Sequence, residues 1–276
     1  MNSQQNVKPS DVGTLPRKRS TLWAVSVPTE HGGWSLTLEP VVLGLIVAWS
    51  WSGLALGVAA MLAFLSRTPL KIVLGDIWRK RWLDRTNIAA RVAGIEVAAF
   101  VLLVFYARIF AEASFWLPLL LAAPLVSIQL WFDIRSKSRR LLPELAGTIG
   151  IGSVATAIAL ANATNNKVAF GMWVVVAARG MAAIPYARTQ VFRKRGRPVK
   201  ILHSDLAQLL AVAISVFGFI EDVAPMASVI AIILIAVFNV VVVRIAPRPA
   251  KIIGLQQMFF GIAVIVITAV AMMSYN

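Results

Sequence analysis

Residues 224–243 read APMASVIAIILIAVFNVVVV, twenty positions without one charged side chain. A helix needs about 20 mostly apolar residues to cross the hydrocarbon core of a bilayer, and this segment has that length. Similar segments recur along the chain, which is 59% hydrophobic and only 14% charged. Soluble domains carry roughly 25% charged residues. The sequence therefore predicts an all-α, multi-pass membrane protein.

Nine segments are apolar enough to be predicted as transmembrane helices, and together they make residues 23–276 one membrane domain. Two boundaries rest on short breaks, at residues 50–53 and at 221–222. The first 22 residues are polar and basic, and we expect them to form a disordered cytoplasmic tail. The predicted spans cover residues 33–51, 53–72, 88–107, 114–132, 142–161, 168–187, 205–221, 224–243 and 252–272.

Positive charge is unevenly distributed along the chain, which has 27 Lys and Arg against 12 Asp and Glu, a net charge of +15. The cations gather in the tail and after the second, fourth, sixth and eighth spans, whereas the alternate connections hold only Arg108 and Lys167. The positive-inside rule then predicts a cytoplasmic N-terminus and an external C-terminus. Because topology explains the charge, the predicted partner is the lipid bilayer and not nucleic acid.

The connections after the second and sixth spans are expected to be long. Loops of this length in a compact protein are usually functional or disordered. Both connections contain aromatic or apolar residues among the cations, such as Trp78, Trp82 and Phe192. We therefore expect short amphipathic helices at the membrane surface in both places.

Ionisable residues open and interrupt the first span. Glu30 and His31 precede it, and Glu39 lies inside it on the same helical face as His31 and Ser35. Ionisable groups within a membrane are costly and point to a functional site or a buried ion pair. Glu30 and His31 are candidates for a catalytic acid or base. The alternative for Glu39 is a structural pair with an arginine of a neighbouring helix.

Arg67 and Lys71 lie four residues apart at the end of the second span, so one helical face presents two cations. Such a pair can bind a phosphate or a carboxylate, Arg through its planar fork and Lys as a point charge. The alternative is that both only mark the cytoplasmic end of the span.

Arg179 falls near the middle of the sixth span, where topology does not explain a cation. Tyr186 follows on nearly the same face and leads toward Arg188, so a polar track from mid-membrane to the cytoplasm is plausible on this helix. We consider Arg179 and Arg188 candidate substrate-binding residues together with Glu39, Arg67 and Lys71. A structural ion pair is equally open for Arg179, and the acids within or near spans are Glu39, Glu96 and Glu144.

Several chemistries are excluded by composition. The chain has no cysteine, and its two histidines are His31 and His203, so disulfides, thiol catalysis and a cysteine or histidine metal site are not expected. Walker A, His-Glu-x-x-His and Gly-x-Ser-x-Gly patterns do not occur. No metal site is predicted.

The opening Pro28-Thr29-Glu30-His31-Gly32-Gly33-Trp34 resembles that of the YwiC-like family of bacterial membrane proteins. A Pro-x-Glu-His-Gly-x-Trp motif is expected there, and it matches at every fixed position. The resemblance continues through Glu39-Pro40, Arg67-Thr68-Pro69, the 133–144 stretch, Tyr186-Ala187-Arg188 and Lys251-Ile252-Ile253-Gly254. It implies a location in the bacterial cytoplasmic membrane and little chemistry.

The chain also resembles, more remotely, the UbiA-type prenyltransferases, which implies a bundle of nine helices with enlarged cytoplasmic loops after the second and sixth. Those enzymes hold magnesium and a prenyl diphosphate on Asp-rich motifs. Where Asn-x₃-Asp-x₃-Asp would begin, this chain has Arg67, Lys71 and Gly75. Cations replace carboxylates, so magnesium-dependent prenyl transfer is in doubt, whereas direct binding of an anionic headgroup remains open.

Two functions follow from these residues. The first is binding or modification of an anionic substrate, such as a prenyl diphosphate or another lipid phosphate, in a cavity open to the cytoplasmic side. The alternative is transport of a small anion or metabolite, for which Arg179 at mid-depth is the main support. Neither establishes whether the protein is an enzyme, and the cofactor is unknown.

Overall fold

The computed structural model describes residues 21–26, 31–137 and 139–274, except for the side chains of Thr21, Ala24 and His31. These residues form ten helices and no strand, so the all-α expectation is confirmed. The predicted tail is described only at its end, where Thr21 and Leu22 already belong to the first helix. The helices are α1 Thr21–Ser26, α2 His31–Val47, α3 Trp51–Trp78, α4 Asp84–Phe110, α5 Trp116–Ile134, α6 Leu141–Ala161, α7 Asn166–Lys194, α8 Leu202–Ile220, α9 Met226–Val242 and α10 Ala250–Met273.

Helices α2 to α10 correspond one to one with the nine predicted spans. Seven of them, α3 to α8 and α10, are long and apolar enough to cross a membrane by length and composition. The other two, α2 and α9, are apolar but have only 17 residues each. At 1.5 Å per residue they reach about 25 Å, near the lower limit for a membrane-spanning helix. The chain is a multi-pass membrane protein.

The prediction of long connections after the second and sixth spans is wrong. Helix α3 continues to Trp78 and α7 to Lys194, which leaves residues 79–83 and 195–201 as short connections. The structure therefore has no separate amphipathic helix in either described connection. The predicted spans end at residues 72 and 187, where the sequence becomes polar and basic. The helices continue beyond these residues, because Arg and Lys near a helix end can extend their charged groups toward water.

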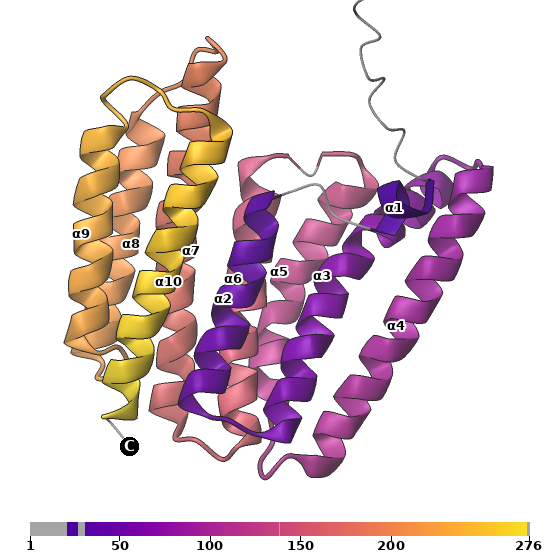
Figure 1. Cartoon of the computed structure of the whole chain (residues 1–276), viewed down its shortest axis with the longest axis horizontal. Helices are drawn as coiled ribbons and strands as arrows, with labels where there is room; N and C mark the ends of the chain where they lie inside the picture. The colour runs from indigo at the N-terminus through magenta and orange to yellow at the C-terminus, as the bar shows by residue number, and fades with distance from the viewer. Residues whose placement is uncertain (1–20, 27–30, 138, 275–276) are drawn as a thin grey trace, which may run out of the picture.

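The two ends of the bundle differ in charge. The connections after α3, α5, α7 and α9 meet at the upper end of Figure 1, and those after α2, α4, α6 and α8 meet at the lower end with the end of α10. Between α2 and α10, every Lys or Arg in a connection is at the upper end, which we call the basic end. The lower connections hold only Glu112, Glu221 and Asp222 as charged residues.

Helices α6 and α7 form the centre of the bundle, since most of their residues are buried, whereas few residues of α4 are. Large apolar side chains such as Ile95 and Leu102 are exposed on α4, as expected for a surface in contact with lipid. Small residues allow the central helices to approach closely. At Gly44 on α2, an added Cβ would lie 2.9 Å from Cβ of Ile158 on α6.

Candidate functional site

A buried ion pair joins α2 and α7 in the middle of the bundle. Nη2 of Arg179 lies 3.6 Å from Oε1 of Glu39, and the two side chains are only 2% and 6% exposed. The Ser35 hydroxyl, one turn earlier on α2, donates a hydrogen bond of 2.9 Å to the same carboxylate oxygen. Glu39 is the central residue of α2, and Arg179 is near the centre of α7. Of the three acids within or near spans, Glu39, Glu96 and Glu144, it is Glu39 that pairs with Arg179.

The guanidinium of Arg179 is only partly satisfied. Its Nη2 donates a 2.5 Å hydrogen bond to the Gln257 backbone carbonyl on α10. Its Nε and Nη1 are buried and have no hydrogen-bond partner among the described residues. A buried donor without a partner costs about 1–3 kcal/mol. The arrangement therefore provides a positive group with two nitrogens, Nε and Nη1, that can donate to an acceptor such as water or an anion.

A glycine on α10 makes room for the carboxylate of this pair. A Cβ added to Gly261 would overlap the carboxylate of Glu39. Helix α10 packs against both α2 and α7, so Gly261 lets three helices converge on the ion pair. Glycines that permit such close approach are common where membrane helices pack.

Polar side chains continue from Arg179 toward the basic end, between α7 and α10. The Tyr186 hydroxyl accepts hydrogen bonds from Nε2 of Gln256, at 3.2 Å, and from Nε2 of Gln190, at 3.4 Å. Tyr186 and Gln190 follow Arg179 by about 10 Å and 16 Å along the helix. Polar side chains of α7 and α10 therefore meet on the basic-end side of Arg179, whereas Arg188 pairs with Glu144 instead.

Buried amide side chains of α8 and α9 are hydrogen-bonded to one another and to α7 and α10. Gln257 donates to Asn239 at 3.4 Å, and Asn239 donates to Gln208 at 3.2 Å. Gln208 in turn donates to the Ala182 carbonyl of α7 at 2.7 Å. Side-chain oxygens of Gln190, Gln256 and Gln257 remain buried without a donor within the described part of the chain. Hydrogen bonds made by amide side chains therefore link α7, α8, α9 and α10 inside the bundle.

Two of the predicted cations at the basic end, Arg67 and Arg188, have an acidic partner. Arg67 forms two hydrogen bonds with Asp133 on α5, of 2.7 Å and 3.2 Å. Arg188 donates to the Arg139 carbonyl at 2.7 Å and to Glu144 at 3.3 Å. Lys71 lies one turn beyond Arg67 on α3. These contacts tie the α5–α6 connection to α3 on one side and to α7 on the other.

The remaining predicted residues cannot be placed. Glu30 lies outside the described residues, and so does the side chain of His31, although its backbone begins α2. Within the described residues, no group of three or more His, Asp or Glu side chains is arranged to hold a metal ion. The geometry of the candidate site therefore rests on Glu39 and Arg179.

Sequence reasoning missed the neutral members of the site. Gln256, Gln257 and Asn239 lie in otherwise apolar helices, where an amide must find a hydrogen-bond partner. The cost of burying an unpaired amide could have pointed to these residues, but only charged residues were considered. Gly261 gave no signal, because only the three-dimensional structure places it opposite Glu39.

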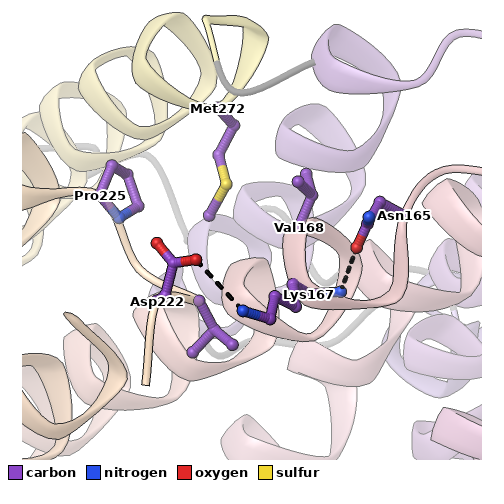
Figure 2. A pocket seen from close by; sticks show the side chains of 7 residues that line it. Asn165, Lys167, Val168, Asp222, Pro225 and Met272 are labelled. Carbon is purple, nitrogen blue, oxygen red and sulfur yellow. Dashed lines mark hydrogen bonds and ion pairs between the residues drawn. The ribbon is translucent and has the colours of Figure 1, made fainter. Parts of the chain in front are cut away.

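A hollow of about 400 Å³ opens at the end of the bundle opposite the basic end. Its walls come from the start of α7, the α8–α9 connection and the end of α10, as Figure 2 shows. Lys167 spans it by an ion pair of 3.2 Å with Asp222, and Asn165 accepts a 2.8 Å hydrogen bond from the Lys167 backbone N–H. About 16 Å of α7 separates Val168 in its wall from Arg179, and Met172 and Val175 are fully buried in between.

Comparison with known proteins supports the family resemblance. Residues 27–159 match the family model of the YwiC-like proteins, so this resemblance is confirmed over that stretch. The match includes Glu39, Arg67 and Asp133, whereas Arg179 and the helices α7 to α10 lie beyond it. No curated protein and no solved structure matches the chain. The remoter resemblance to UbiA-type prenyltransferases stays a prediction.

Proposed function

We propose that this YwiC-like, multi-pass membrane protein transports a small anion, which binds to Arg179 between α2, α7 and α10. The observation that carries the proposal is the guanidinium of Arg179, which is 2% exposed and has two nitrogens without hydrogen-bond partners. A cation held in the middle of an apolar bundle is expensive, and such residues typically belong to substrate pathways. An anion that accepts hydrogen bonds from Nε or Nη1 satisfies groups that the protein leaves unsatisfied.

Features on both sides of Arg179 support a path through the helices α7 to α10. Toward the basic end, Tyr186, Gln190 and Gln256 provide hydroxyl and amide groups for a polar solute. Toward the opposite end lies the hollow crossed by Lys167 and Asp222. Buried apolar side chains close the stretch between the hollow and Arg179. Tyr186 and Gln190 are fully buried as well, so the path is closed on both sides of Arg179, and transport requires the helices to open each side in turn.

The test is uptake by proteoliposomes that contain the purified full-length protein. Chloride, nitrate, sulfate and succinate are supplied separately outside the vesicles, and their accumulation inside is measured against protein-free vesicles. We expect uptake of at least one of these anions by the wild type. The Arg179→Gln variant should lose at least 90% of that uptake, because about 1.4 kcal/mol of lost binding is already a tenfold change in affinity.

Two further variants distinguish loss of the site from loss of the fold. Arg91→Gln is the matched control, because Arg91 is an exposed arginine within helix α4, and uptake should stay at the wild-type level. Arg179→Gln combined with Glu39→Gln avoids leaving a lone buried carboxylate and should also be inactive. Wild-type uptake in either Arg179 variant, or no uptake of any of the four anions by the wild type, would refute transport through this site.

A second candidate function is binding of an isoprenyl diphosphate, or another lipid phosphate, at the basic end. Its support is that Arg67 and Arg188 lie on either side of the α5–α6 connection and keep 20% and 27% of their side chains exposed. Against it, Asp133 and Glu144 already neutralise these cations, so a diphosphate must compete with two carboxylates.

Titration of the purified protein with farnesyl diphosphate tests this second function. Saturable binding that weakens at least tenfold in Arg67→Gln and in Arg188→Gln, but not in Arg195→Gln, would support it. Arg195 is the control because it is exposed at the same end. Absence of binding, or equal binding by all three variants, would exclude this second function.

A further inference from the structure

Binding of an anion at Arg179 changes the net charge of a buried site. The pair of Arg179 and Glu39 is neutral as a whole when both groups are ionised. An added monovalent anion would leave one uncompensated negative charge among buried groups, which is costly in a medium of low dielectric constant. Arg179 cannot relieve this by changing its own charge, since a guanidinium stays protonated in proteins. The adjustment falls to the carboxylate.

We propose that Glu39 takes up a proton when the anion binds, so that the protein moves the anion together with a proton. The inference rests on the proposed transport function and deepens it by naming the proton as the second substrate. A proton from water forms an O–H bond with the Glu39 carboxylate, and the positive charge of Arg179 then balances the anion. When the anion leaves, the proton returns to water and the original ion pair forms again.

The surroundings of Glu39 suit both protonation states. The Ser35 hydroxyl donates to Oε1 of the carboxylate, and a hydroxyl can also accept a hydrogen bond from a protonated carboxyl group. Gly261 leaves space for the carboxyl group on the α10 side. The change of charge therefore needs no change of position.

Other ionisable groups on the helices packed against α2 have different roles. Helices α3, α6, α7 and α10 make these contacts. Arg179 is the charged group within ion-pair distance of Glu39 among the described residues. Glu144, on α6, pairs with Arg188, and Arg67 on α3 pairs with Asp133. The other ionisable residues of these four helices are Lys71, Asp76, Lys167, Tyr186, Arg193, Lys194 and Lys251, and α2 itself adds His31.

The experiment measures proton movement and anion uptake in the same proteoliposomes. The vesicles contain the pH-sensitive dye pyranine, and an inward gradient of chloride, nitrate or sulfate is applied at equal internal and external pH. These are anions of strong acids, which carry no proton near neutral pH. For the monovalent anions chloride and nitrate, we expect the vesicle interior to acidify with about one proton per anion taken up, as neutrality of the buried site requires.

The decisive variant is Glu39→Gln, which keeps the shape of the side chain and an oxygen that can accept from Ser35. Acidification should fall to the level of protein-free vesicles, and whatever anion uptake the variant retains should depend on the membrane potential. Glu96→Gln is the matched control, since Glu96 is a glutamate within helix α4, and it should acidify as the wild type does.

Different outcomes of this experiment would overturn proton coupling, the role of Glu39, or transport itself. Anion uptake without acidification in the wild type would overturn proton coupling and leave transport standing. Acidification by Glu39→Gln at the wild-type rate would show that another group carries the proton and would overturn the assignment to Glu39. If the wild type takes up none of chloride, nitrate, sulfate and succinate, anion transport itself is refuted. If Glu39→Gln does not fold, the wild-type measurement still decides proton coupling, because anion uptake without acidification overturns it.

Discussion

At the scale of single residues, the cost of burying a charge was the most informative signal in the sequence. It singled out Glu39 and Arg179 separately, and the structure shows that they are partners at 3.6 Å. Arg67 was singled out for its spacing from Lys71, and the structure shows that its partner is Asp133. The sequence could not predict which acid meets which cation, because this depends on how helices distant in sequence pack together. It also gave no reason to single out Gly261.

The first prediction concerns the space opposite Glu39. Gly261→Ala should destabilise the protein by about 1–3 kcal/mol, because the added methyl group overlaps the Glu39 carboxylate and the packed helices must shift. Gly254→Ala, in the same helix, is the control, since nothing lies within 4 Å of the position of its Cβ. Thermal unfolding in detergent, followed by circular dichroism, should show a lower midpoint for Gly261→Ala only. Equal midpoints would mean that the carboxylate moves aside at no cost.

At the scale of helices, hydropathy located all nine segments but misjudged how far two of them extend. Helices α3 and α7 continue past the predicted span ends, residues 72 and 187, by about two turns. The reason is that Arg67 and Asp133 can pair between packed helices, so a charged residue need not mark the end of a helix. The long loops that supported a UbiA-like architecture are therefore absent from the described residues, and that architecture loses its main structural argument.

The second prediction compares two ion pairs that connect helices. Arg67→Met should destabilise the protein by about 3–5 kcal/mol, because it leaves the carboxylate of Asp133, which is 1% exposed, without a charged partner. Lys167→Met should cost at most about 1 kcal/mol, because Lys167 and Asp222 are both more than 60% exposed. Denaturation midpoints of the two variants under the same conditions provide the comparison. Similar losses would show that burial does not govern these pairs.

At the scale of the whole molecule, the distribution of charge over the two ends is the feature that the sequence predicted best. Alternation of basic and non-basic connections appeared in the linear chain, and the structure gathers the basic ones at one end (Figure 1). The sequence could not show that α6 and α7 are central and α4 peripheral. All are apolar, and only packing distinguishes a lipid-facing helix from a buried one.

The last prediction fixes the orientation, which the charge distribution implies but the fold alone does not. The positive-inside rule places the basic end in the cytoplasm. The chain has no cysteine, so each introduced thiol is the single target of a membrane-impermeant maleimide. Arg197→Cys changes an exposed residue of the basic end, and Glu221→Cys changes an exposed residue of the opposite end. In intact bacterial cells that express the protein, Glu221→Cys should be labelled and Arg197→Cys should not, and permeabilised cells should label both. The reverse pattern would place the basic end outside. The polar side chains of α7 and α10 would then lie on the exterior side of Arg179, and the hollow at Lys167 and Asp222 would open to the cytoplasm.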